Sequence, residues 1–401
     1  MLIKPAMVGV SPFGSSRVRI SAEVEYATSQ LPRETYWFDF PAEYRDQLSL
    51  SGSPWLTLLL PLACQLGEEL HLASPVDATL LEGACENMRV WARWHKDMQP
   101  ISIIASLEPL PEIVQRRRVG TFFSGGADSF FTLLQHEDPP NPMPRVDDLV
   151  TIWGFDIPID RPEEVEHARA SIAEVARIYG KGFIDIWTNL RLTQSENVSW
   201  GERLHGPAMI AVAQFLESRF SRVLIPSSYS YSNLSPWGSH IVTDQNFSTS
   251  ATRFTYDGGG FTRNQKIAAI RHHAPALAYL RVCWIGATAR NCMKCGKCVR
   301  TMLALEAFGV RSQCSAFDYD AFSLDFLRSY KLDEEYEYDT FADIYAQIDK
   351  DAQRPLAEAL AECLRLNRSR FDRIARLKQL EMMPLVGWLF GWYKRQFITG
   401  R

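Results

Sequence analysis

The segment that decides the fold is Val119 to Leu134, VGTFFSGGADSFFTLL. It begins with the apolar run of a buried strand and ends with the apolar content of a helix. Between the two lies a glycine turn, Ser124-Gly125-Gly126-Ala127-Asp128-Ser129. A strand, a glycine turn and a helix in this order aim several backbone N–H groups at one point, and the helix N-terminus adds its positive end. The segment therefore predicts an anion site suited to phosphate.

Each residue of the turn suits phosphate in its own way. Gly125 and Gly126 let the backbone approach an anion where a Cβ would clash. The hydroxyls of Ser124 and Ser129 can donate hydrogen bonds to phosphate oxygens. Asp128 fits beside an anion only if a cation lies there too, and Mg²⁺ bridging phosphates would meet that need. The alternative is a capped helix without a ligand, but the whole string S-G-G-x-D-S favours phosphate.

The chain after this turn alternates strands with helices. Strands are expected at 119–123, 148–155, 183–187 and 222–226, and helices at 128–136, 162–179 and 201–220. Such alternation is typical of parallel βαβ units. We therefore expect an α/β fold with a doubly wound, Rossmann-like parallel sheet covered on both faces. Residues 227–275 lack clear periodicity, and a stretch that long is usually functional or disordered.

The flanking regions have different patterns. Alternating residues predict strands at 17–26 and 34–40, and a helix is expected from Ser74-Pro75 to about Lys96, with Ser74 as N-cap. From about Thr301 onward the apolar spacing is helical. We therefore expect three domains, namely an N-terminal α+β accessory domain (1–115), a domain built on the glycine turn (116–300) and a helical C-terminal extension (301–401).

Four of the eight cysteines form the pattern C-x8-C-x2-C-x2-C, at Cys283, Cys292, Cys295 and Cys298. Four thiolates with two short C-x2-C steps suit tetrahedral Zn²⁺, and four ligands leave no open position, so the zinc would be structural. An iron–sulfur cluster is the main alternative. Zinc is favoured because nothing else in the sequence suggests redox chemistry.

The string SGGADS resembles the phosphate loop of the PP-loop N-type ATP pyrophosphatases, also called the adenine nucleotide alpha hydrolase-like superfamily. The resemblance covers roughly residues 119–300. It implies the HUP fold of that superfamily, binding of ATP and Mg²⁺ at the turn, cleavage between the α and β phosphates, and adenylation of a substrate oxygen. A Walker A lysine does not follow the glycines, which argues against an ordinary kinase or motor ATPase.

The cysteine pattern is similar to that of the 7-cyano-7-deazaguanine synthases, and Thr262-Arg263 stands where that family usually has Thr-Lys. The resemblance implies an AMP-forming carbon–nitrogen ligase that makes an amide or nitrile from a carboxylate and a nitrogen donor. Residues 1–115 and 301–401 have no counterpart in that family, and residues 227–249 do not match its substrate region. The substrate therefore stays open, small or protein-borne, and the extra regions suggest a protein partner.

Further candidate site residues lie at a strand end and in the irregular stretch. Asp156 follows the second strand, where carboxyl ends of strands line the ligand crevice, so it could contact the adenosine or cap a turn. Arg263 and Lys266 could neutralise phosphate in catalysis together with Ser124, Asp128 and Ser129, or be exposed surface charges. The expected substrate contacts are His205, which is equally a candidate structural residue, Trp237, His240 and Asp244.

Composition limits the other functions. The net charge of -4 does not favour nucleic acid, so no stable nucleic-acid binding is expected. The nearest candidate for a membrane span, Met382 to Tyr393, is too short and contains Pro384, so a packed helix is favoured over a membrane-surface one. Clustered cysteines without a leader predict a reducing compartment, the cytoplasm. A homodimer is left open.

Two functional alternatives are a PP-loop enzyme of sulfur transfer or tRNA modification, and a nucleotide-binding module without catalysis.

Overall fold

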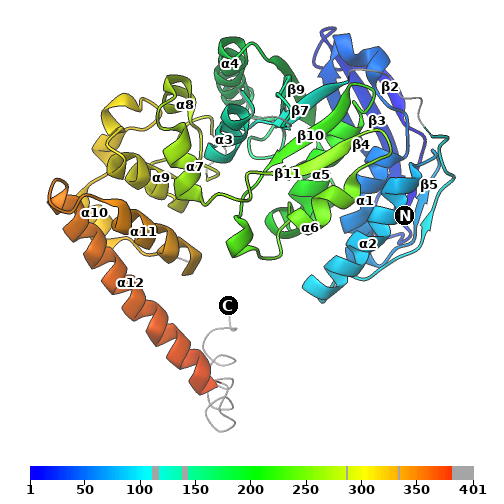
Figure 1. Cartoon of the computed structure of the whole chain (residues 1–401). Helices are drawn as coiled ribbons and strands as arrows, with labels where there is room; N and C mark the ends of the chain where they lie inside the picture. Colours follow the sequence, from blue (N-terminus) through cyan, green and yellow to red (C-terminus); the bar gives the residue numbers. More distant parts are fainter. Residues whose placement is uncertain (111–116, 138–142, 286–287, 333–334, 382–401) are drawn as a thin grey trace. The chain divides into compact units, whose positions relative to one another are not determined.

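The computed structural model describes residues 1–110, 117–137, 143–285, 288–332 and 335–381 (Figure 1). Contacts between Cα atoms divide the chain into two compact units, Met1–Asn291 and Cys292–Arg401. We call them the first and the second unit. The division falls close to the expected domain limit at residue 300, whereas no division falls near residue 115.

The centre of the first unit is a parallel sheet, which confirms the expected α/β class. Its strands are β7 (Arg118–Phe122), β8 (Asp148–Trp153), β9 (Gly182–Thr188), β10 (Phe220–Pro226) and β11 (Arg253–Asp257). They lie in the order β11-β10-β7-β8-β9, and every neighbouring pair is parallel. Four of these strands were predicted from the sequence within a few residues.

The chain reverses direction across the sheet at β7. Helices α3 (Ala127–Gln135) and α4 (Pro162–Ile178) carry it from β7 through β8 to β9, and α5 (His205–Gln214) returns it to β10, on the other side of β7. Right-handed crossovers require helices from the two directions to cover opposite faces. Figure 1 shows α3 and α4 on one side of the strands and α5 on the other. The reversal places a topological switch point between β7 and β10.

The N-terminal region extends the same sheet. Strand β4 (Glu34–Pro41) pairs antiparallel with β9, with Phe38 opposite Thr188, and β3 (Arg17–Glu25) pairs with β4. The short strands β1 (Leu2–Ile3), β2 (Met7–Val10), β5 (Leu70–Leu72) and β6 (Ile103–Ile104) continue outward. Helix α1 (Ser53–Leu66) packs on α5, where the ring of Trp55 lies 5.1 Å from that of Phe215. Residues 1–110 therefore share a sheet and a core with the region that contains β7 to β11.

Two helix predictions in this unit are wrong in detail. Helix α2 (Ala78–Trp94) begins after Asp77, whose Oδ1 accepts from the N–H of Leu80 at 2.9 Å, and not at Ser74. The carbonyl of Pro75 instead accepts from Gly52 at 2.7 Å, which holds residue 75 outside the helix. The helix expected at 201–220 is divided into a π-helical turn (Trp200–Leu204) and the shorter α5.

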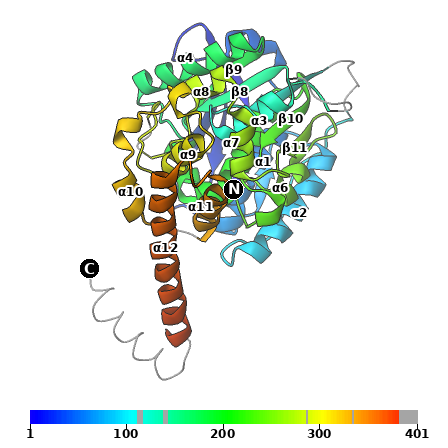
Figure 2. The ribbon, with the colours of Figure 1, turned by 60° about the vertical axis from the view of Figure 1, so that its left-hand side comes forward.

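The remaining helices of the first unit lie in the stretch that we expected to be irregular or functional. They are α6 (Ile241–Asp244), α7 (Arg263–Ile270) and α8 (Ala274–Tyr279). Helix α8 packs against α4, and α7 packs against α3 (Figure 2). These contacts bring residues 258–283 alongside the helix that follows the glycine turn.

The second unit is helical, as its apolar spacing predicted. It contains α9 (Gly296–Ala307), α10 (Leu324–Ser329), α11 (Glu335–Gln347) and α12 (Arg354–Glu381). Helix α12 packs on α10 and α11. Among the described helices, none combines the length and the apolarity that crossing a membrane requires. The segment Met382 to Tyr393, for which a packed helix was predicted, lies outside the described residues.

Candidate functional site

The glycine turn lies at the carboxyl end of β7 and leads directly into α3. Gly125 has a φ of 76°, a left-handed conformation that glycine adopts without strain. Gly126 is the N-cap of α3, and Ala127 begins the helix. Ser124 is exposed, whereas Ser129 is buried and donates from Oγ to the carbonyl of Gly126 at 2.9 Å. The turn is thus a backbone arc at a helix N-terminus, at the switch point of the sheet, with Ser124 exposed on it and Gly125 buried.

Two cations hold Asp128, the acidic residue of the turn. The Arg263 guanidinium lies 2.8 Å from Oδ2, and the Lys266 ammonium lies 3.1 Å from Oδ1. Lys266 also donates to the carbonyl and the Oγ of Ser227, at 2.6 and 2.7 Å. Its residue surface is 1% exposed, and this burial lowers the pKa of Lys266. Lys266 is therefore a buried charge and not a surface one, and Arg263 and Lys266 both place positive charge beside Asp128.

Helix α7 presents both cations because its start is well capped. Thr262 Oγ1 accepts from the N–H of Gln265, and the Gln265 side chain accepts from the N–H of Thr262 at 2.9 Å. This capping box fixes the first turn of α7, which carries Arg263 and Lys266. Ser227 follows β10, and Asp128 follows β7. Lys266 therefore links the ends of the two strands at the switch point.

The structure brings together two of the predicted substrate residues, His205 and Trp237. Their ring centroids lie 5.8 Å apart, and the Trp237 ring lies 5.6 Å from that of Tyr229. Gly206 and Gly238, the neighbours of these two residues, let their backbones come close, because a Cβ on Gly206 would lie 2.0 Å from the carbonyl oxygen of Gly238. A nitrogen of His205, Nδ1, lies 2.9 Å from the carbonyl oxygen of Trp200. His205 therefore also has the structural role that was weighed for it.

His240 and Asp244 belong to one buried turn around α6. His240 Nδ1 accepts from the N–H of Val242 at 3.0 Å, its ring packs edge-on against Trp94, and burial lowers the pKa of His240. Asp244 is fully buried and accepts from Ser239 Oγ at 2.6 Å. Burial raises the pKa of Asp244 to about 7. The remaining candidate, Asp156, lies exposed in the turn after β8.

Sequence reasoning missed a second buried ion pair behind the site. His136, at the end of α3, has Nε2 3.0 Å from Asp257 Oδ1 and Nδ1 2.6 Å from the carbonyl oxygen of Pro144. Thr132 Oγ1 donates to the other oxygen of Asp257 at 2.7 Å. The pair ties α3 to the end of β11. The available signal was Asp257 before three consecutive glycines, but β11 itself was not predicted.

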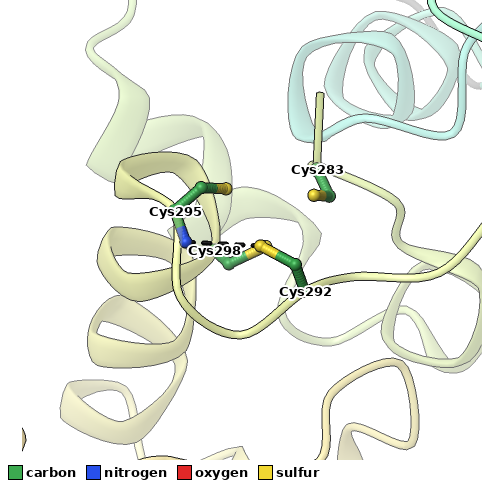
Figure 3. Close-up of side chains that lie close together, drawn as sticks. All are labelled: Cys283, Cys292, Cys295 and Cys298. Atoms are coloured by element: carbon green, nitrogen blue, oxygen red, sulfur yellow. Dashed lines mark hydrogen bonds between the residues drawn. The ribbon is translucent and has the colours of Figure 1, made fainter. Parts of the chain in front are cut away.

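The four cysteines of the C-x8-C-x2-C-x2-C pattern lie together, as expected for a metal site (Figure 3). All four Sγ atoms lie within 4.8 Å of one another, and those of Cys292 and Cys298 are 3.9 Å apart. A tetrahedral ion with Zn–S bonds of about 2.3 Å needs sulfurs about 3.8 Å apart. In a four-iron cluster each cysteine binds a different iron, which sets the sulfurs further apart. The spacing therefore fits one ion such as zinc.

Local backbone features shape this cysteine cluster. Cys295 is the N-cap of α9 and its N–H donates to the Sγ of Cys292 at 3.3 Å. Cys298 lies in the first turn of α9, and Met293 has a φ of 58°, which lets the chain turn between Cys292 and Cys295. Thiolate charge is stabilised at a helix N-terminus. The cluster can hold a metal by four thiolates and leaves no position for a substrate.

Comparison with protein-family models, with curated proteins and with solved structures finds no match for this chain. What the chain itself establishes is an α/β fold with a mostly parallel central sheet and a cluster of four cysteines that can hold a metal. The function must be argued from the chemistry of the glycine turn.

Proposed function

We propose that this chain is an AMP-forming, ATP-dependent carbon–nitrogen ligase of the PP-loop class, with the HUP variant of the doubly wound fold. The observation that supports it best is the glycine turn at the switch point of the sheet, with Gly125 in a left-handed conformation and Lys266 buried beside Asp128. Switch points are where open parallel sheets bind their ligands. A backbone cradle with nearby cations suits a triphosphate.

In this proposal the triphosphate of ATP lies along the turn. A carboxylate oxygen of the substrate attacks the α-phosphorus, the bond to the β-phosphate oxygen breaks, and pyrophosphate leaves with that oxygen. The turn N–H groups, Arg263 and Lys266 stabilise the charge that develops on the leaving group. Asp128 is the residue that would hold Mg²⁺, which supplies further positive charge to the phosphates.

The second half of the reaction releases AMP. A nitrogen nucleophile attacks the carbonyl carbon of the acyl adenylate, AMP leaves with the former carboxylate oxygen, and the nitrogen loses a proton as the amide forms. His205 and Trp237 are proposed substrate contacts, because their rings lie together and they follow β9 and β10 in the chain. The cysteine cluster is proposed to hold structural zinc.

The test measures AMP and pyrophosphate from Mg²⁺-ATP with a panel of carboxylates and ammonia. Lys266→Met should lower pyrophosphate release by about a hundredfold or more, the usual loss when a charge-stabilising group is removed. Lys181→Met is a matched control, because Lys181 is also buried, pairs with Glu137 at 3.1 Å and precedes the amino end of β9. The control should retain activity within a few-fold.

Other outcomes separate the alternatives. Pyrophosphate and AMP formed with tRNA and a sulfur donor, but with no carboxylate, would support the sulfur-transfer alternative. Nucleotide binding without any product would support a non-catalytic module. Formation of ADP, or no binding of nucleotide, would contradict the proposal.

A further inference from the structure

We propose that the metal at the cysteine cluster orders the glycine turn, through the segment Leu280–Cys283, so that metal binding and phosphate binding are coupled. Only the nucleotide part of this inference rests on the proposed function. Leu280–Cys283 follows α8 and ends at the first of the four cysteines. The metal would then act on the turn as well as on the local fold.

The segment lies directly against the turn. The N–H of Arg281 donates to the carbonyl of Gly125 at 2.7 Å. A Cβ on Gly125 would lie 3.5 Å from the carbonyl oxygen of Tyr279 and 3.7 Å from the Cβ of Arg281. This hydrogen bond holds the peptide that follows Gly125, whose N–H belongs to Gly126. That N–H donates to Ser124 Oγ at 3.4 Å, a long bond that an anion bound at the turn would replace.

Asn291 locks this segment to the next cysteine. Its Oδ1 accepts from the N–H groups of Val282 and Cys283, at 2.9 and 3.2 Å, and its Nδ2 donates to the carbonyl of Leu280 at 2.9 Å. Asn291 is 6% exposed and directly precedes Cys292. We call residues 283–292, the C-x8-C part of the pattern, the arm. The buried side-chain amide of Asn291 therefore holds the two ends of the arm together.

The arm also has one hydrogen bond to Arg281 and one to helix α4. Arg281 Nε donates to the carbonyl of Thr288 at 3.0 Å, and the N–H of Ala289 donates to Glu164, on α4, at 2.7 Å. A metal that joins Cys283 to Cys292 closes the ends of this arm and lowers the entropic cost of its ordered form. Without the metal, the arm loses the link between Cys283 and Cys292 and opens more readily, and the Gly125–Arg281 bond opens with it. Coupling of this kind is reciprocal, so nucleotide should in turn tighten metal binding.

The experiment that tests the coupling needs no nucleotide. Amide hydrogen exchange of Arg281 and ¹⁵N relaxation of Gly125 and Gly126 are measured with the metal bound and after chelation. Chelation should speed exchange of the Arg281 amide about tenfold or more and increase the motion of both glycines. Unchanged exchange and relaxation, with metal analysis confirming removal, would overturn the inference.

A variant covers the case in which chelation unfolds the protein. Asn291→Ala keeps all four cysteines, so it should keep one metal per chain and still loosen Arg281 and Gly125. Asn367→Ala is the matched control, because buried Asn367 accepts from Leu332 at 3.0 Å and donates to the carbonyl of Tyr330 at 2.8 Å in the second unit. It should leave the exchange of Arg281 unchanged, and equal effects of the two variants would contradict the inference.

Calorimetry with Mg²⁺-ATP adds the functional readout. Binding should weaken about tenfold in the chelated protein and in Asn291→Ala, and remain unchanged in Asn367→Ala. If the metal-loaded wild type binds no nucleotide, the proposed function fails, while the exchange data still decide the coupling. If nucleotide binds equally with and without metal, the coupling fails and the proposed function stands.

Discussion

Three buried ionisable residues of the first unit, Lys266, His136 and Asp244, differ in whether a group of opposite charge lies beside them. Lys266 faces the carboxylate of Asp128, and His136 faces that of Asp257. Asp244 faces the hydroxyl of Ser239 and the backbone of His240, and burial raises its pKa to about 7. An acid without a cation in a dry site is stable in its neutral form. These differences predict different responses to pH.

Asp244→Asn should change the pH dependence of stability. The pKa of Asp244 is higher in the folded than in the unfolded state, so its stabilising effect is full below its usual pKa and is lost as pH rises through about 7. The variant is neutral throughout, so relative to wild type it should gain on the order of 2–4 kcal/mol between pH 5 and pH 8. Urea unfolding at both pH values checks this, and a pH-independent difference would contradict it.

His136 should titrate above its usual range. Burial alone would lower the pKa of His136, but the hydrogen bond and charge of Asp257 outweigh burial and the repulsion of Arg222, and the net shift is upward. Both ring nitrogens face acceptors, so both carry hydrogen. Its contribution to stability is present at low pH and is lost as pH rises through the raised pKa. NMR titration checks this, and Asp257→Asn should lower the pKa.

For single residues, the sequence predicted which side chains belong to the candidate site better than it predicted which residues they contact. The turn, Arg263, Lys266 and the four cysteines could be selected because local spacing carries the signal. Ser227, Asp257 and Asn291 could not, because each acts through a residue that is distant in the sequence or through the backbone. His240 and Asp244 were selected for composition alone, and the structure places both in a buried turn.

Among the elements, α7 has the clearest link between local structure and the site. Thr262→Ala removes the capping box and should cost about 1 kcal/mol of stability. It should also lower pyrophosphate release several-fold, because the frayed turn carries Arg263 and Lys266. Thr262→Ser keeps the cap and should behave like wild type. Thermal unfolding and the product assay check both effects, and a full-activity Thr262→Ala would argue against this role for α7.

Gly83 tests the packing of α2. Alanine in a helix interior normally stabilises by up to about 1 kcal/mol relative to glycine. Here a Cβ would lie 1.7 Å from the backbone oxygen of Asn246, so Gly83→Ala should instead destabilise by about 2–4 kcal/mol. Gly260→Ala is the control, because no atom lies within 4 Å of its Cβ position. Chemical denaturation measures both, and a stabilised Gly83→Ala would show that the contact relaxes easily.

Helices and strands could be predicted from the sequence where their apolar residues recur at a regular spacing. Strands β7, β8, β9 and β10 and helices α3 and α4 have such a spacing. Helix α1 was missed because SPWLTLLLPLACQL is apolar on nearly all sides, is buried in the core, and contains Pro61. Strand β11 was missed because five residues, RFTYD, lie within a polar stretch and at the edge of the sheet.

For the whole molecule, metal analysis should find about one zinc per chain. Removing it with a strong chelator should lower the unfolding temperature, since a structural zinc adds its binding free energy to folding. Visible absorbance from iron and sulfide would contradict the single-ion assignment, and absence of any metal would contradict a metal site. Protein with all four cysteines changed to serine provides the metal-free control.

The arrangement of the N-terminal region could not be predicted from sequence. The pairing of Phe38 with Thr188 joins residues about 150 positions apart, and no local pattern encodes such a pairing. The strands at 17–26 and 34–40 were predicted, but their place in the larger sheet depends on the pairing of β4 with β9. This explains why a separate accessory domain was expected where the first unit is continuous.

The antiparallel pairing of β4 with β9 also limits how this protein can be truncated or fused to other proteins. A fragment beginning at residue 117 would leave β9 with an open hydrogen-bonding edge and Phe215 without Phe38, whose ring lies 5.2 Å away. Such a fragment should associate through that edge and precipitate when expressed alone. The part of this chain that contains the glycine turn is therefore not a transferable module, and fusions or truncations must carry the first hundred residues with it.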